Sequence, residues 1–133
     1  MDFDKKDDLK DRLKELVFQT KSVYEKIGFV FCPAIMKDVR FNASGFHHLL
    51  YKTNGQPRTI MERIYKLTLL PLAKAVVKNS DYVNEERDVW IKGEKRKTYT
   101  LVAVVGKKRP IRIRVILIQT KSGEIVFRSI MKD

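Results

Sequence analysis

The spacing of the apolar residues changes near Arg87, and this change constrains the fold more than any other feature of the chain. Before Arg87 the apolar residues recur every three or four positions, as on one face of a helix. After Arg87 they alternate with polar residues, which is the period of a half-buried strand. Helices followed by a contiguous antiparallel sheet define an α+β domain. The pattern therefore predicts three or four N-terminal helices packed on a four-stranded antiparallel sheet.

A first helix is expected over residues 4–27. Its apolar stripe consists of Leu9, Leu13, Leu16, Val17, Tyr24 and Ile27, with Val23 beside it. Aspartates at positions 7, 8 and 11 lie early, where the helix dipole favours acids, and Gly28 is a stop signal. Because the polar face carries balanced charge, we expect residues 1–27 to form a scaffold helix.

N-cap residues and helix-breaking residues predict where the remaining helices begin and end. Ser44 is expected to cap a helix over residues 45–52, after which "TNGQP" breaks the chain. Thr59 opens the capping box T-I-M-E, so a third helix runs to about residue 70, and Pro71 starts a fourth that ends near residue 78. Earlier, Pro33 argues against a continuous central strand, although residues 38–41 can form a short extended piece.

The alternating region divides into four strands. They are predicted over residues 87–92, 98–105, 110–119 and 124–131. The turns "KGEKRK", "GKKRP" and "TKSGE" are too short for a crossover, so neighbouring strands are expected to be antiparallel. With no repeat or linker, the 133 residues are expected to form one domain, 1–133.

Composition excludes several classes of protein. Apolar residues are 44% and charged residues 33%, which is typical of a globular domain. No run of about 18 apolar residues suggests a membrane span, and "MDFDKKDDLK" lacks the apolar stretch of a signal peptide. The single Cys32 rules out an internal disulfide, and no zinc spacing can be assembled. A cytoplasmic location is the default expectation, although a toxin domain cut from a secreted protein would look the same.

The net charge of +12 is concentrated in one part of the chain. Residues 1–27 hold seven Lys/Arg and seven Asp/Glu, whereas residues 28–133 hold twenty-one and nine. A basic sheet half indicates a polyanionic partner, most often nucleic acid. The alternative is that the excess charge serves only solubility.

Two adjacent histidines, His47 and His48, are the only ones in the chain. Adjacent helical residues point about 100° apart, so the two cannot face one site in the same way. His48 lies one turn before Lys52, and Arg58 follows the next break, which gives a local cationic cluster. Histidine is the natural proton shuttle near neutral pH. The alternative is that one histidine packs at the core edge while the other faces water.

The last predicted hairpin places arginines on a sheet. From Pro110, alternation gives one aliphatic face and one face that carries Arg112 and Arg114. Guanidinium groups in an open groove suit phosphate, because their paired donors match its oxygens. The position of Ser129 depends on the turn. A three-residue loop with Gly123 left-handed puts Ser129 on the aliphatic face, whereas a two-residue loop or a bulge puts it on the arginine face.

The order "VRFNASGFHHLLYK", "PR", "NSDYV", "YTLVAVV", "IRIRVILI" and "IVFRSIM" resembles the barnase–EndoU–colicin–RelE group of small ribonucleases, in particular its phage-associated branches. The resemblance covers about residues 38–131. It implies helices on a small twisted sheet whose open face carries the active site. It also implies cleavage of RNA without a metal, by attack of the 2′-hydroxyl on the neighbouring phosphate.

The resemblance also implies roles for particular residues. The catalytic residues would be His48, Arg58, Arg112 or Arg114, and Ser129. From their charge alone, we expect further RNA contacts at His47, Lys52, Lys97, Lys108, Arg109 and Arg128, although the basic turns are most simply solvated. The expected partners are RNA and an antitoxin or immunity protein, with no membrane and no cofactor. Two alternatives stay open: a non-catalytic RNA- or DNA-binding domain, and an interaction module for an acidic protein.

Overall fold

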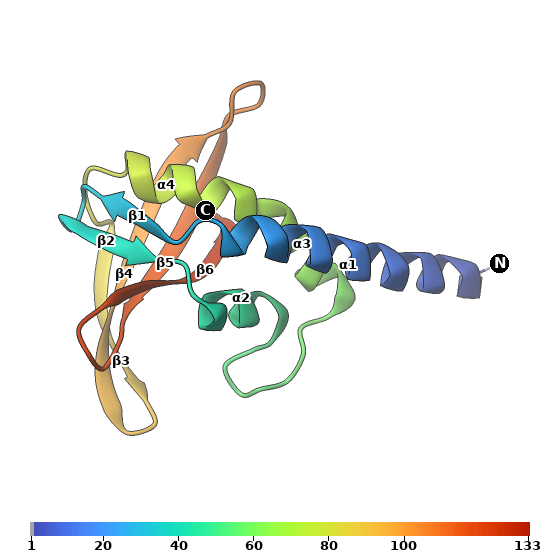
Figure 1. Cartoon of the computed structure of the whole chain (residues 1–133), viewed down its shortest axis with the longest axis horizontal. Helices are drawn as coiled ribbons and strands as arrows, with labels where there is room; N and C mark the ends of the chain where they lie inside the picture. Colours follow the sequence, from blue (N-terminus) through green and yellow to red (C-terminus); the bar gives the residue numbers. More distant parts are fainter. Residues whose placement is uncertain (1) are drawn as a thin grey trace.

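The structure is a computed structural model that describes the backbone of residues 2–133 and the side chains of residues 7–133. Figure 1 shows helices gathered beside one twisted sheet. The elements in chain order are α1 (Asp2–Glu25), β1 (Phe29–Cys32), β2 (Lys37–Arg40), α2 (Ala43–Leu50), α3 (Ile60–Leu69), the 3-10 turn η1 (Leu70–Leu72), α4 (Ala73–Asn79), β3 (Glu85–Ile91), β4 (Glu94–Val105), β5 (Ile111–Gln119) and β6 (Ile125–Lys132). All helices in this described part precede β3, so the expected α+β class is confirmed.

The predicted four-stranded antiparallel sheet is incomplete. Within residues 2–133 the sheet has six strands in the order β1-β2-β6-β5-β4-β3. The four expected strands pair antiparallel with one another, but β2 pairs parallel with β6 at Val39–Ile125 and Arg40–Val126. The extra strands form a hairpin with Pro33 in its turn, where a missing N–H breaks no ladder. Strands of four residues are too short for alternation to reveal them.

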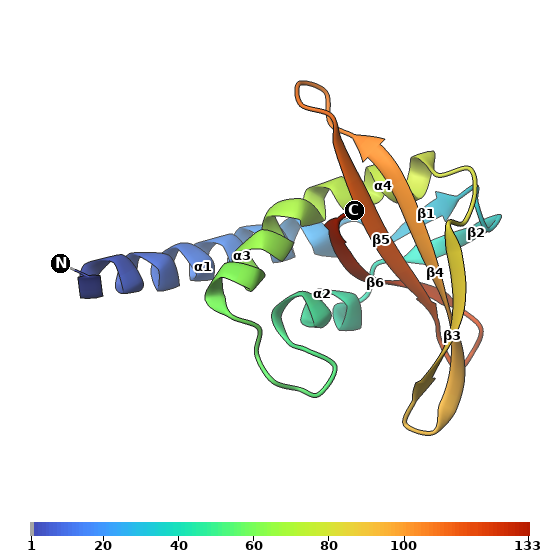
Figure 2. The same cartoon turned by 180° about the vertical axis from the view of Figure 1, so that it is seen from behind.

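One face of the sheet carries the helices (Figure 2). The aliphatic face of β5 is confirmed, because Ile113, Val115 and Leu117 are completely buried. Val76 and Val77 of α4 are also completely buried, and α4 packs on β1, β4 and β5. Full burial of each such side chain stabilises the fold by about 1.5–3 kcal/mol. Among the described residues, no helix covers the opposite face of β3–β5, and α2 borders that face beside β6.

Helix α1 is only partly used by this core. Leu13 and Tyr24 are buried, whereas Phe18 and Val23 on the same helix are 78% and 58% exposed. Both views show the first half of α1 running out beyond the rest of the chain (Figures 1 and 2). The helix ends before the predicted residue 27, and Gly28 then takes a φ of +65°, which suits glycine. The part of α1 from Leu13 onward is therefore the part that packs.

Helix α2 begins earlier than predicted. Asn42, not Ser44, is its N-cap, and the Asn42 Oδ1 accepts a hydrogen bond from the Gly45 N–H at 3.0 Å. Gly45 lies so close to β6 that an added Cβ would be 2.4 Å from the Phe127 carbonyl oxygen. The predicted cap of α3 is confirmed, since the Thr59 Oγ1 accepts from the Glu62 N–H at 3.1 Å. Close packing against β6 thus fixes where α2 lies.

Candidate functional site

Two adjoining grooves lie on the sheet face that α4 does not cover, and α2 borders the first of them. The first, about 280 Å³, is lined by Ser44 and His48 of α2 together with Ile91, Arg96, Ile118 and Arg128 of the strands, among others. The second, about 270 Å³, is lined by Arg87, Thr98, Thr100, Arg114, Ile116 and Arg128, among others. Because Arg128 lines both, we treat them as one feature and call it the open-face groove. The groove is rich in guanidinium groups and hydroxyls, which are ligands for phosphate.

A β-bulge brings Arg128 into the groove. The turn is the three-residue loop, because the Thr120 N–H donates to the Glu124 carbonyl at 2.7 Å and Gly123 has a φ of +90°. Further along, Leu117 pairs with Phe127 but Ile116 pairs with Ser129, so Arg128 is an extra residue on β6. The bulge reverses the alternation, and Ser129 joins the strand positions of the arginine face. The three-residue loop alone would place Ser129 on the aliphatic face. The bulge shifts the register by one residue and places Ser129 opposite Ile116 instead.

His48 is partly buried at the edge of this groove. Burial lowers the pKa of its imidazole, and the positive charges of Arg128, His47 and Arg58 lower the pKa further. The imidazole is therefore neutral at neutral pH, which is the form that accepts a proton. His48 reaches the open face because α2 turns Leu49 into the core, where that side chain is completely buried.

Arg58 lies next to α2 but is engaged in structural bonds. Its Nε donates to the His48 carbonyl oxygen at 3.0 Å, and its backbone N–H donates to the Leu50 carbonyl oxygen at 2.9 Å. Its Nη1 also lies 3.9 Å from the Glu62 carboxylate. Arg58 therefore holds the loop between α2 and α3 against the histidine-bearing helix and contributes positive charge near His48.

Lys66 is a functional candidate that the sequence reasoning missed. Its side chain on α3 is buried, and Nζ donates to the Ser129 Oγ at 3.1 Å and to the Ile130 carbonyl at 2.9 Å. Burial, with help from the charge of Arg58, lowers its pKa to about 8. The available signal was its position three residues before Leu69, on the buried stripe of α3. Ser129 is thus oriented by a lysine amine.

Arg112 and Arg114 lie on the predicted face but are both held by Asp133. Arg112 Nε donates to the Asp133 carboxylate at 2.6 Å, and Arg114 Nε donates to its other oxygen at 3.0 Å. These two bonds lower the pKa of the Asp133 carboxyl. Of the two arginines, only Arg114 lines the open-face groove with Arg128. Arg112 lines neither part of the groove, and Arg114 lines the part that His48 does not line.

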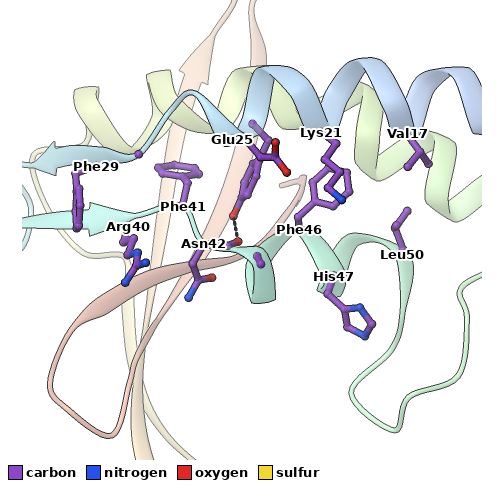
Figure 3. Close-up of a pocket in the computed structure, with 13 residues that line it drawn as sticks. Val17, Lys21, Glu25, Phe29, Arg40, Phe41, Asn42, Phe46, His47 and Leu50 are labelled. Carbon is purple, nitrogen blue, oxygen red and sulfur yellow. Dashed lines mark hydrogen bonds between the residues drawn. The ribbon is translucent and has the colours of Figure 1, made fainter.

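His47 faces a different cavity. Its ring stacks on Tyr51 with centroids 4.4 Å apart, and it lines a pocket of about 610 Å³ between α1, β2 and α2. Figure 3 shows His47 below Phe46 and Leu50, with Lys21 and Arg40 at other points of the same pocket. The two histidines thus lie on different sides of α2, as their adjacency predicted.

The other predicted RNA contacts lie outside the groove. Lys97 alternates with Arg96 and Thr98, so it lies on the other face of β4, where it pairs with Glu86 at 3.0 Å. Lys108 and Arg109 are exposed in the β4–β5 turn, and Lys52 is exposed after α2. Of the predicted RNA-binding set, Arg128 alone is in the groove, whereas Arg87 and Arg96 line it without having been predicted.

Comparisons with protein-family models, curated proteins and solved structures found no match. Among the described residues, no helix combines the length and the apolar character needed to cross a membrane.

Proposed function

We propose that the chain is a metal-independent endoribonuclease whose active site is the open-face groove. The observation that carries this proposal is that a partly buried histidine with a lowered pKa shares one groove with Arg128. A neutral imidazole that shares a groove with a guanidinium is what cleavage of a phosphodiester by its own 2′-hydroxyl needs. The resemblance in element order to small ribonucleases supports the same reaction.

In the proposed step the His48 imidazole takes the proton of the 2′-hydroxyl. The 2′-oxygen then forms a bond to phosphorus while the bond from phosphorus to the 5′-oxygen breaks. The products are a 2′,3′-cyclic phosphate and a 5′-hydroxyl whose proton comes from water. Negative charge builds on the non-bridging oxygens during this step, and donors fixed in a partly dry site stabilise it.

Arg128 is assigned to that charge. It is partly buried, and it forms no ion pair with any acid among the described side chains. Burial lowers the pKa of its guanidinium, but arginine stays protonated at neutral pH. Arg114, in the same groove, would hold the next phosphate once released from Asp133. Ser129 and Lys66 would support β6 beside the bulge.

A non-catalytic RNA- or DNA-binding domain is the second candidate. The observation in its favour is that Arg87, Arg114 and Arg128 line the groove whether or not His48 acts, although Glu85, also in the lining, pairs with Arg87. Such a domain would bind nucleic acid with a strong dependence on salt and would cleave nothing.

Incubation of the purified chain with total RNA and a chelator tests the proposal. His48→Ala should abolish cleavage, a loss of at least about 100-fold, while binding of an uncleavable 2′-O-methyl RNA persists. His47→Ala is the matched comparison, since it removes the neighbouring imidazole from the other side of α2. Salt-sensitive binding with no cleavage by the wild-type chain would leave the binding-domain candidate, and equal cleavage by both variants would remove His48 from the site.

A further inference from the structure

Strand β1 forms one edge of the sheet and leaves its outer side unpaired. Across the β1–β2 hairpin, the Phe41 N–H donates to the Gly28 carbonyl at 2.8 Å, in register with Val30 opposite Val39. In an antiparallel ladder every second residue bonds to the partner, so the N–H and C=O groups of Phe29 and Phe31 point outward. No loop or side-chain hydrogen bond of the described residues engages these four groups.

The side chains of this edge are apolar and exposed. Phe29 is 59% exposed and Phe31 is 49% exposed, whereas Val30 and Cys32 are buried toward the helices. Edge strands that avoid pairing are very short, are bulged, or carry a charge or a proline within the strand. Strand β1 is short, with four residues, but its sequence FVFC carries no charge and no proline, since Pro33 follows it. The edge therefore combines free backbone donors and acceptors with two apolar side chains.

A groove of about 400 Å³ runs between this edge and α4. It is lined by Phe29, Val30, Phe31 and Pro33 together with Lys74 and Lys78. Both lysines are exposed, stand one turn apart on α4, and form no ion pair with any described side chain. None of the described residues that line this groove is acidic. It thus presents two unpaired positive charges beside an unpaired strand.

We propose that the β1 edge docks an extended acidic segment of a partner protein, which adds a seventh strand to the sheet. Backbone bonds to Phe29 and Phe31 would fix the segment, and its acidic side chains would meet Lys74 and Lys78. A second copy of this chain is disfavoured, because pairing two β1 edges would bring four lysines together. A nucleic acid could meet the lysines but has no backbone ladder to match the strand. The surface lies at the opposite edge from β3 and is separate from the open-face groove.

The test uses the full chain labelled with ¹⁵N and a synthetic peptide of alternating valine and glutamate. Titration by NMR should shift the amide signals of Phe29 and Phe31 most and slow their hydrogen exchange. A peptide N-methylated at every second residue, on the side that faces β1, should bind at least about tenfold more weakly. A peptide with lysine in place of glutamate should not bind.

Charge variants of the protein provide the matched control. Lys74→Gln with Lys78→Gln should weaken peptide binding by about tenfold or more, because both charges lie in the groove. Lys10→Gln with Lys14→Gln changes the net charge equally at the same spacing on α1, and should change binding less than about twofold.

Three results would overturn the proposal: no shifts at Phe29 and Phe31 at millimolar peptide, equal binding of the N-methylated peptide, or weakening by the α1 pair as large as that by the α4 pair. Sedimentation as a dimer that dissociates with Phe31→Pro would assign the edge to a second copy instead. Loss of RNA binding in the α4 pair, with peptide binding unchanged, would assign the lysines to nucleic acid.

Discussion

Arg112 and Arg114 of β5 lie on the same face of the sheet as Arg128 of β6. An acidic side chain binds the two arginines of β5, whereas no described acid binds Arg128. Arg112 and Arg114 are 63% and 42% exposed, and the Asp133 carboxylate binds both. Arg128 is partly buried, pairs with no described acid and lies in the groove with His48. A phosphate approaching Arg112 has to displace a carboxylate, whereas one approaching Arg128 does not. Residue type and strand face are therefore not enough to identify a phosphate ligand.

Among the arginines of this face, the largest expected effect comes from removing Arg128. Arg128→Ala should lower kcat/KM for RNA cleavage by about 100-fold, which is about 2.7 kcal/mol of transition-state stabilisation. Arg112→Ala removes the same group from the same face and should cost less than about tenfold, because Asp133 already occupies it. Steady-state kinetics on a short RNA would measure both. Equal losses in the two variants would show that the bond from Arg112 to Asp133 does not keep Arg112 from acting on the phosphate.

The strands that build this face could be predicted from the sequence, but the contrast between their arginines could not. Alternation from Ile111 to Leu117 fixes which side chains face the helices, because it is a local property. The bulge at Arg128 depends on how β6 meets β5 and α2, and the bond from Asp133 to Arg112 spans 21 positions. The same holds for Lys66, whose partner Ser129 is 63 positions away. Contacts between distant segments leave no period in a sequence.

A second prediction concerns the packing that holds α2 against the bulged strand. In Gly45→Ala the new Cβ would be 2.4 Å from the Phe127 carbonyl and 2.7 Å from the Tyr24 hydroxyl. We expect the free energy of unfolding, measured in urea, to fall by about 1–3 kcal/mol. Cleavage should fall as well, because α2 must move and carry His48 away from Arg128. Ser22→Ala, at an exposed position of α1, should leave both unchanged.

Releasing the β5 arginines should have a smaller effect in the opposite direction. Asp133→Asn removes the charge that holds Arg112 and Arg114, so both become available to phosphate. Affinity for an uncleavable RNA should rise by about threefold to tenfold at low salt. The slope of log affinity against log salt should become steeper by the amount expected for about one additional phosphate contact. Asp38→Asn makes the same charge change at an exposed position of β2 and should raise affinity less. Unchanged affinity in Asp133→Asn would show that these arginines meet no RNA.

The smallest effect is on the titration of His48, and it separates the two regions directly. Because burial and Arg128 lower the pKa of His48, its imidazole signals in NMR should titrate below the usual value of 6.5. Arg128→Met should move that pKa upward, whereas Arg112→Met should leave it in place, since Arg112 is not among the charges that lower it.

The lowered pKa of His48 also makes the stability of the fold depend on pH. As pH falls through 6.5 the unfolded chain binds a proton before the folded chain does, so the free energy of unfolding should decrease toward acid pH. His48→Gln should remove this part of the decrease. A His48 pKa above 6.5, or equal shifts in the two arginine variants, would contradict the assignment of Arg128 as the charge that acts on the histidine.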